Sequence, residues 1–372
     1  MISLARGARR AAYRAAHRIL HAAPLKLWRR LVPKSELGVC YHVVADGPVA
    51  HIKHYRYLDT ASFGADLDYL ERRFRFITYE QLCRARAAPP PRPGNSVILT
   101  FDDGFAECAT VVAPLLRRRG LRCVFFVITD LIDNQMLFRE SVASLCIEAI
   151  MAMPFGQVEA RAVECGLGAL LQPDPGASLA APTTTRPLGL AELDPQLDRR
   201  LLPLLRWLLQ LPQSEEGRAA TLLARLGIDI RGYLQQVQPY LTSAQIRQLH
   251  ADGFTIGAHS CSHRRLQELS PQEAEHEILE SCRRIRALTG QSSVPFAFPY
   301  FGGGLDRAWL ARLRAQHDFL GLFFDTNGVC ADEPFVVQRV FGERFTGDQS
   351  LDAILRRAWA HPAAWRRRAP AT

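Results

Sequence analysis

The sequence predicts an α/β protein in which βα units build a largely parallel sheet, folded as one barrel-like domain that carries a helical insertion. Short runs rich in β-branched and aromatic residues alternate with helical runs along most of the chain, and this alternation is typical of parallel βα folds. The run 122–128 (RCVFFVI) has no polar alternation, which indicates a strand buried on both faces. Residues 131–240 contain hardly any strand pattern, so we predict that they form the insertion.

Seven runs have the composition of strands. The run SVILTF is representative, because it follows the proline-rich connector 87–95, which would stop any helix, and is dominated by apolar and β-favouring residues. The predicted strands are 37–44, 96–101, 122–128, 254–260, 294–300, 319–326 and 335–341.

Helices are predicted from apolar spacing and from their end signals. Residues 61–74 place four apolar side chains at spacings of four, three and four, as one face of a helix does. The run 241–253 opens with a Thr242 to Gln245 capping box, and the run 270–290 opens with Ser270, Pro271 and Glu273 and closes on a glycine. Within the insertion, 197–211 and 215–227 are predicted helices, and 174–187 is a loop by composition.

Charge is distributed unevenly along the chain. The formal net charge is +9, but residues 1–34 carry nine Arg or Lys and no acid, and the tail from Arg356 adds five more, so the body of the protein is net acidic. A nucleic-acid-binding body is therefore not expected. The segment 1–34 is basic and contains Leu and Trp, so we predict peripheral contact with an anionic membrane surface, and a helix that is merely solvated or packed on the domain is the alternative.

The cysteines and the N-terminus predict a cytoplasmic protein. Nine cysteines are scattered without a CxxC pair, a pattern typical of free thiols in a reducing compartment. Arginines interrupt every apolar run near the N-terminus, so no secretory signal is predicted. The expected location is the cytoplasm, with peripheral contact at the inner face of the membrane. Residues 35–372 are expected to form the folded domain, with its insertion at about 131–240.

Acidic and imidazole side chains follow two of the predicted strands. Asp102 and Asp103 end the strand 96–101, the position from which α/β barrels project catalytic residues. Taken alone, DDG is more often only a turn, with an Asx interaction and a glycine at positive φ. His259 and His263 follow the run FTIGA, and a spacing of four lets two imidazoles share one metal from one side of a helical turn. Alone, such a pair is usually coincidental.

Two further elements complete a candidate site. The run FAFPYFGGG (296–304) passes through Tyr300 into a glycine-rich turn, and backbone amides in such a turn can donate to a developing oxyanion. His42 ends the first strand, and it lies on the same rim as the other candidates if the strands are parallel. A tight loop and a structural histidine are the alternatives.

Together, these motifs resemble the polysaccharide deacetylase family, also called the NodB homology or carbohydrate esterase 4 family. TFDDG is similar to its first motif, HSCSH to its second and FPYFGG to its third, and the resemblance spans about residues 37–345. It implies a distorted (β/α)7 barrel, here with a helical insertion, and hydrolysis of N-acetyl, sometimes O-acetyl or formyl, groups on a sugar with a divalent metal, most often Zn²⁺.

The resemblance also implies roles for individual residues. Asp103, His259 and His263 would hold the metal, and Asp102 would be the general base. The backbone N–H of Tyr300 would bind the oxyanion, following the third motif. The expected carbohydrate is a bacterial surface polysaccharide, an oligosaccharide or a lipid-linked precursor, and the basic N-terminus would suit the lipid-linked form.

The sequence departs from the family pattern at two places. No convincing late histidine motif is present, so the general-acid role is assigned to His42, by similarity to family members that begin with a YH strand and have a permuted motif order. The arginine that usually precedes the third motif is replaced by Ala297 and Phe298, and Arg339 is the candidate to substitute for it. Two alternatives stay open: a non-catalytic carbohydrate-binding relative, and a hydrolase of another amide, such as a formamide.

Overall fold

The computed structural model describes residues 36–52, 56–87, 95–171, 198–344 and 350–361. The basic segment 1–34, most of the connector 87–95 and the loop 174–187 lie outside the described residues, so the predictions made for them stay predictions. Among the described residues, no helix is long and apolar enough to cross a bilayer.

Seven strands close into a parallel barrel. The ring runs β1, β8, β7, β6, β5, β4, β3 and back to β1, and β2 pairs with β3 on the outside. Every ladder is parallel, so the predicted parallel sheet and (β/α)7 barrel are confirmed. The strands are β1 (Leu37–Tyr41), β2 (Arg75–Phe76), β3 (Ser96–Phe101), β4 (Val124–Val127), β5 (Thr255–Ala258), β6 (Val294–Ala297), β7 (Leu320–Asp325) and β8 (Val336–Phe341).

Burial of both strand faces explains why these strands lack polar alternation. Every residue of β3 and of β7 is buried. One set of strand side chains, including Ile98, Phe126 and Phe324, forms a cluster with Tyr79 and Leu82 of α4 (Tyr79–Ala87). The other set packs against the surrounding helices.

The helices around the barrel match most of the predicted ends. They are α3 (Thr60–Glu71), α5 (Ala113–Arg118), α11 (Ser243–Ala251), α12 (Pro271–Thr289), α13 (Arg307–Gln316) and α14 (Leu351–Ala360). The capping boxes predicted for α11 and α12 are both present. Gly290 ends α12 with φ +72°, a left-handed conformation that glycine adopts without a steric penalty.

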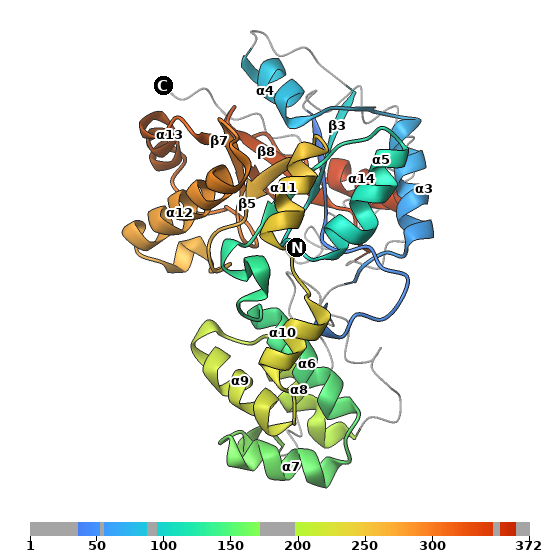
Figure 1. Cartoon of the computed structure of the whole chain (residues 1–372), viewed down its shortest axis with the longest axis vertical. Coiled ribbons are helices and arrows are strands. Elements are labelled where there is room, and N and C mark those ends of the chain that lie inside the picture. Colours follow the sequence, from blue (N-terminus) through green and yellow to red (C-terminus); the bar gives the residue numbers. More distant parts are fainter. Residues whose placement is uncertain (1–35, 53–55, 88–94, 172–197, 345–349, 362–372) are drawn as a thin grey trace, which may run out of the picture.

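The insertion between β4 and β5 is helical, and its buried apolar side chains form a cluster that also includes Val43, Ile52 and Phe105 from the barrel side. It contains α6 (Arg139–Met151), α7 (Phe155–Glu164), α8 (Leu202–Leu209), α9 (Glu216–Arg225) and α10 (Ile230–Val237). Figure 1 shows these helices gathered below the barrel, at the end opposite α4. They therefore lie toward the carboxyl ends of the strands, where the candidate side chains follow β3 and β5.

One local prediction is wrong. His259 and His263 lie in a loop that follows β5, and not on a helical turn. Ser260 and His263 have φ values of +64° and +58°, which interrupt any helix. Glu277 of α12 holds this loop, because its carboxylate accepts hydrogen bonds from the backbone N–H groups of Cys261 (2.8 Å) and Ser262 (3.0 Å). Cys261 is buried, in agreement with its interpretation as a packed thiol.

Candidate metal and acid–base site

Asp102 and Asp103 lie in a tight turn at the end of β3, and both are almost completely buried. Asp103 has φ +71° and Gly104 has φ +76°. A Cβ atom on Gly104 would lie 2.9 Å from Cγ1 of Val127, so the turn requires glycine for its backbone conformation and for space. Asp102 is hydrogen-bonded to Arg339, whereas Asp103 is the nearer of the two to His259.

Asp103 converges with His259 and His263. Oδ1 of Asp103 lies 3.4 Å from Nε2 of His259 and 3.5 Å from Nε2 of His263. Nδ1 of His259 lies 2.9 Å from the carbonyl oxygen of Ala297, which fixes that nitrogen as the donor and turns Nε2 toward Asp103. Burial, and then the neighbouring His259, lower the pKa of His263 well below its usual value, so its imidazole is neutral, as a metal ligand must be.

These three residues fit a divalent metal. Zinc lies about 2.0–2.2 Å from nitrogen and oxygen ligands, and tetrahedral angles then place two ligand atoms roughly 3.3–3.5 Å apart. The two contacts of Asp103 have these lengths and are longer than normal hydrogen bonds. Three protein ligands of this kind, with a further position left for water or substrate, are typical of catalytic zinc sites.

A second group of potential ligands, Cys40, His42 and Asp102, also lies within ligand distance. Burial raises the pKa of the Cys40 thiol well above its usual value, so the thiolate that a metal needs is disfavoured. Asp102 is in addition bound by an arginine. The first group is therefore the better metal site.

Arg339 binds Asp102 through both terminal guanidinium nitrogens. Nη1 donates to Oδ1 over 2.6 Å and Nη2 to Oδ2 over 2.9 Å, and Nη1 also donates to Oγ1 of Thr100. Arg339 is 0% exposed and Asp102 is 2% exposed. Burial alone would raise the pKa of Asp102, but the charge of Arg339 outweighs it and the pKa is lowered to about 2. Asp102 is thus ionised and fixed in orientation.

His42 is paired with Glu343, which the sequence analysis did not identify. Nδ1 of His42 lies 3.1 Å from Oε1 of Glu343, and the backbone N–H of His42 donates to the same oxygen over 2.5 Å. Burial would lower the pKa of His42, but the carboxylate of Glu343 outweighs it and raises the pKa to about 9. His42 is therefore protonated at neutral pH, and it lies beside Asp102.

The family match follows this geometry. Residues 90–155 and 213–318 match the family model of polysaccharide deacetylases. These segments contain both aspartates of β3 and both histidines that follow β5. The chain carries a polysaccharide deacetylase domain. The family resemblance and the predicted enzyme class, a hydrolase that acts on C–N bonds other than peptide bonds, are confirmed, and a carbohydrate is the substrate class.

Three solved structures align with the deacetylase chain. The Streptococcus pyogenes deacetylase PplD in complex with acetate is 14% identical, with a TM-score of 0.49, and the alignment covers 83% of this chain and 93% of that one. IcaB from Ammonifex degensii is 16% identical, with a TM-score of 0.46 and coverages of 88% and 98%. The BpsB deacetylase domain from Bordetella bronchiseptica is 16% identical, with a TM-score of 0.43 and coverages of 83% and 97%. A comparison with curated proteins found no match.

Tyr300 of the deacetylase domain is held in a left-handed conformation, with φ +60°. Oγ1 of Thr326 donates to its carbonyl oxygen over 2.7 Å. Its hydroxyl donates to Glu140 and accepts from Arg139, both at the start of α6. Among the described residues, the hydrogen bonds of Tyr300 involve its hydroxyl and carbonyl groups and not its N–H, so the N–H is available to a ligand.

The environment of Tyr300 joins the insertion to the site. Its ring centroid lies 4.7 Å from that of His263, and the guanidinium of Arg265 lies 4.0 Å above its ring. Phe138, which precedes α6, contacts His263 edge to face. The contribution of the insertion was missed by the sequence analysis, because no local motif surrounds Phe138, Arg139 or Glu140.

The pairing of His42 with Glu343 predicts a change in pH dependence. A general acid acts only while protonated, so the kcat of the deacetylase should fall as pH rises through the pKa of His42, at about pH 9. Glu343→Gln keeps an acceptor for the backbone N–H of His42 but removes the charge that raises this pKa. We expect the alkaline limb of the kcat profile to move down by at least about 1 pH unit. An unmoved limb in a folded variant would contradict the role of Glu343.

Proposed function

We propose that the chain is a metal-dependent deacetylase that removes an N-acetyl group from a sugar of a surface polysaccharide, an oligosaccharide or a lipid-linked precursor. The single observation that supports this most strongly is the convergence of an Asp103, His259 and His263 ligand set with the ionised Asp102 and the protonated His42. Amide hydrolysis requires a base that is ionised and an acid that is protonated at the same pH, and a lowered pKa of the base with a raised pKa of the acid provides both.

Each residue has a distinct part in the proposed reaction. A divalent metal, which we propose to be Zn²⁺, would polarise the acyl carbonyl and lower the pKa of water when bound by the three ligands. Asp102, oriented by Arg339, accepts the proton of the attacking water. The N–H of Tyr300 donates to the developing oxyanion. His42 gives its proton to the leaving amine, which departs poorly as an anion.

Arg339 also bears on the non-catalytic alternative. That alternative was favoured by the absence of an arginine before the third motif. The guanidinium of Arg339, on β8, donates to both oxygens of Asp102, and this contact supports Arg339 as the arginine that orients the proposed base. A carbohydrate-binding relative without turnover is therefore the weaker candidate.

The location of the enzyme remains our proposal. Nine basic residues in 1–34 support peripheral contact with the anionic inner face of a membrane, where a lipid-linked sugar would be presented. Nine free cysteines are consistent with the cytoplasm. Co-sedimentation of the full chain and of a chain starting at Ser35 with anionic vesicles tests the membrane contact, and equal solubility of the two would remove it.

Product analysis tests the proposed activity. The metal-loaded chain is incubated with N-acetylated, N-formylated and O-acetylated oligosaccharides, and released acetate and formate are measured. We expect acetate from the N-acetylated substrate, and none from it with Asp102→Asn. Formate alone would redirect the assignment to another amide. Binding of all substrates without any product would support the non-catalytic alternative.

A further inference from the structure

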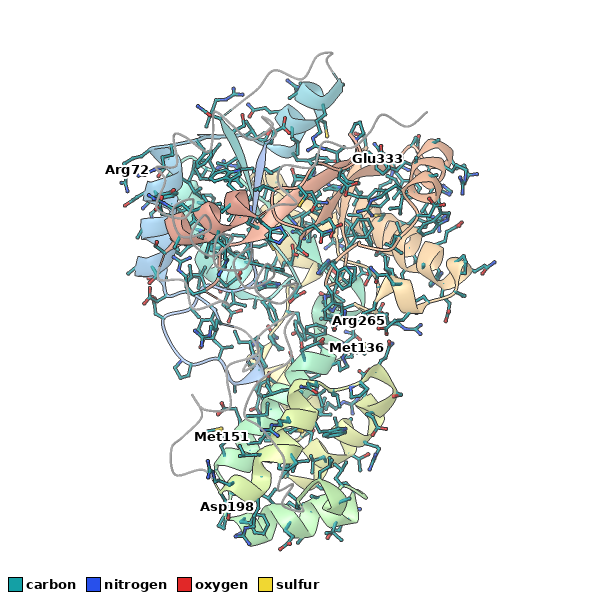
Figure 2. The ribbon with its side chains drawn as sticks, turned by 180° about the vertical axis from the view of Figure 1, so that it is seen from behind. Arg72, Met136, Met151, Asp198, Arg265 and Glu333 are labelled. Carbon is teal, nitrogen blue, oxygen red and sulfur yellow. The ribbon has the colours of Figure 1, made fainter. Side chains whose placement is uncertain are left out.

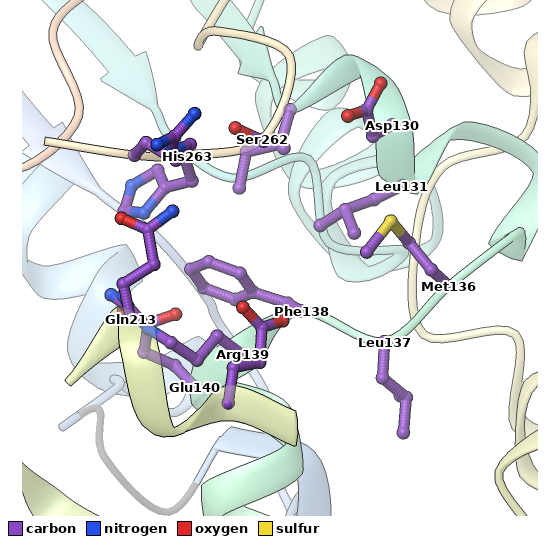
Figure 3. Close-up of a pocket in the computed structure, with 13 residues that line it drawn as sticks. Asp130, Leu131, Met136, Leu137, Phe138, Arg139, Glu140, Gln213, Ser262 and His263 are labelled. Atoms are coloured by element: carbon purple, nitrogen blue, oxygen red, sulfur yellow. The ribbon is translucent and has the colours of Figure 1, made fainter. Parts of the chain in front are cut away.

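A pocket lies between the helical insertion and the loop that carries His263. Its wall includes Arg139 and Glu140 at the start of α6, Gln213 and Glu216 from the start of α9 and the short turn before it, and Ser262 and His263 from the loop after β5. Figure 3 shows the labelled side chains of this wall around one opening, with the amide of Gln213 extending toward His263. The pocket therefore begins at one of the proposed metal ligands and continues along the insertion.

The insertion side of the pocket is rich in hydrogen-bond acceptors. Oε1 of Glu140 accepts from the hydroxyl of Tyr300, while Oε2 of Glu140 is buried without a hydrogen-bond partner among the described residues. A buried carboxylate oxygen without a donor costs free energy unless a ligand or water supplies one. Glu216 provides a second, half-buried carboxylate in the same wall.

Positively charged side chains line the same pocket. Arg139 pairs with Oε1 of Glu140 at 2.8 Å, and Asp130, at the opposite side of the pocket, pairs with Arg284. The charge of Arg139 also acts on Glu216, whose carboxylate forms no ion pair within 4 Å in the part of the chain that the structure describes. Oε2 of Glu140 is left without a donor. Arg264 also lines the pocket, and its Nε is buried without a hydrogen-bond partner among the described residues. The pocket therefore offers both donors and acceptors, which suits a neutral group that carries several hydroxyls.

We propose that this pocket binds the sugar unit next to the one that loses its acetyl group, with Glu140 and Glu216 accepting hydrogen bonds from sugar hydroxyls and Gln213 orienting the unit toward the metal site. This inference rests on the proposed function. It assigns a substrate-length preference to the insertion, because a monosaccharide at the metal would leave the pocket empty. It also gives the insertion helices a role in recognition that the barrel motifs do not have.

Binding and turnover of substrates of two lengths test this inference. Calorimetry measures the affinity of the Asp102→Asn chain for N-acetylglucosamine and for its tetrasaccharide, and acetate release by the otherwise unchanged chain gives kcat/KM for both. Glu216→Gln and Gln213→Ala are introduced into each background. Glu215→Gln is the matched control, because Glu215 is adjacent in sequence but pairs with Arg218 outside the pocket.

We expect the unchanged pocket to give the tetrasaccharide a higher affinity and a higher kcat/KM than the monosaccharide. Glu216→Gln and Gln213→Ala should each lower the ratio of the tetrasaccharide value to the monosaccharide value by about tenfold, because each removes a hydrogen bond to a charged or amide group. Values for the monosaccharide, and all values for Glu215→Gln, should stay the same. A length preference that survives both pocket variants, or no preference at all, would overturn the inference. Length-dependent binding without acetate release would instead contradict the proposed function and leave the pocket assignment standing.

Discussion

Replacing His42 with asparagine should lower the rate of acetate release from an N-acetylated sugar by about 10²–10⁴-fold, the usual contribution of a general acid. An asparagine amide can still donate to Glu343, so the loop after β1 should keep its position. The proton that His42 holds at neutral pH, because Glu343 raises its pKa to about 9, is the one that the leaving amine needs. Kinetics at pH 7 on the metal-loaded protein measure the loss.

A substrate with a good leaving group provides the control for this variant. Nitrophenolate departs without protonation, so His42→Asn should lower the hydrolysis of nitrophenyl acetate far less than it lowers the hydrolysis of the amide. Equal losses on the two substrates would show that His42 supports the structure of the site and does not act as an acid. The ratio of the two losses therefore separates the roles.

The second large effect is expected on stability. Arg339→Met should lower the free energy of unfolding by about 3–5 kcal/mol, because it leaves the charge of Asp102 buried without its partner. The pair is enclosed by the barrel, and the Arg339 guanidinium also lies 5.3 Å from the ring centroid of Phe126. Urea unfolding of the metal-free protein measures the change.

A surface pair is the matched control for Arg339→Met. Arg284 pairs with Asp130, but their side chains are 44% and 31% exposed, so Arg284→Met should cost no more than about 1 kcal/mol. The double variant Asp102→Asn with Arg339→Met removes both charges and should recover part of the loss. A cost for Arg339→Met as small as that for Arg284→Met would contradict the structural importance of this pair.

Local sequence signals were sufficient for the barrel and for the proposed metal ligands. Strands such as β3 and β7 are apolar throughout because both faces are buried, and the capping boxes of α11 and α12 are short-range patterns. The residues that follow β3 and β5 meet because parallel strands end at one rim, so strand order along the chain was enough to bring Asp103 and His259 together.

The remaining features depend on how the ring closes and could not be found in this way. Glu343 reaches His42 only because β8 pairs with β1. Glu140 reaches Tyr300 only because the insertion folds under the barrel, and Figure 2 shows the insertion helices below the barrel from the opposite side as well. The loop that carries His263 was taken for a helical turn because a spacing of four is also helical, and the positive φ of Ser260 is not visible in sequence.

The most direct test is the metal content of the purified chain, measured by elemental analysis after zinc loading and dialysis. The test variants are Asp103→Asn and His259→Gln. Asparagine is chosen because it tolerates the positive φ of position 103. The control is His276→Gln, on the exposed face of α12. We predict close to one zinc per unchanged or control chain, and little in either site variant. A folded, zinc-loaded chain that retains no metal, or that retains it equally in all variants, would contradict the proposed metal site.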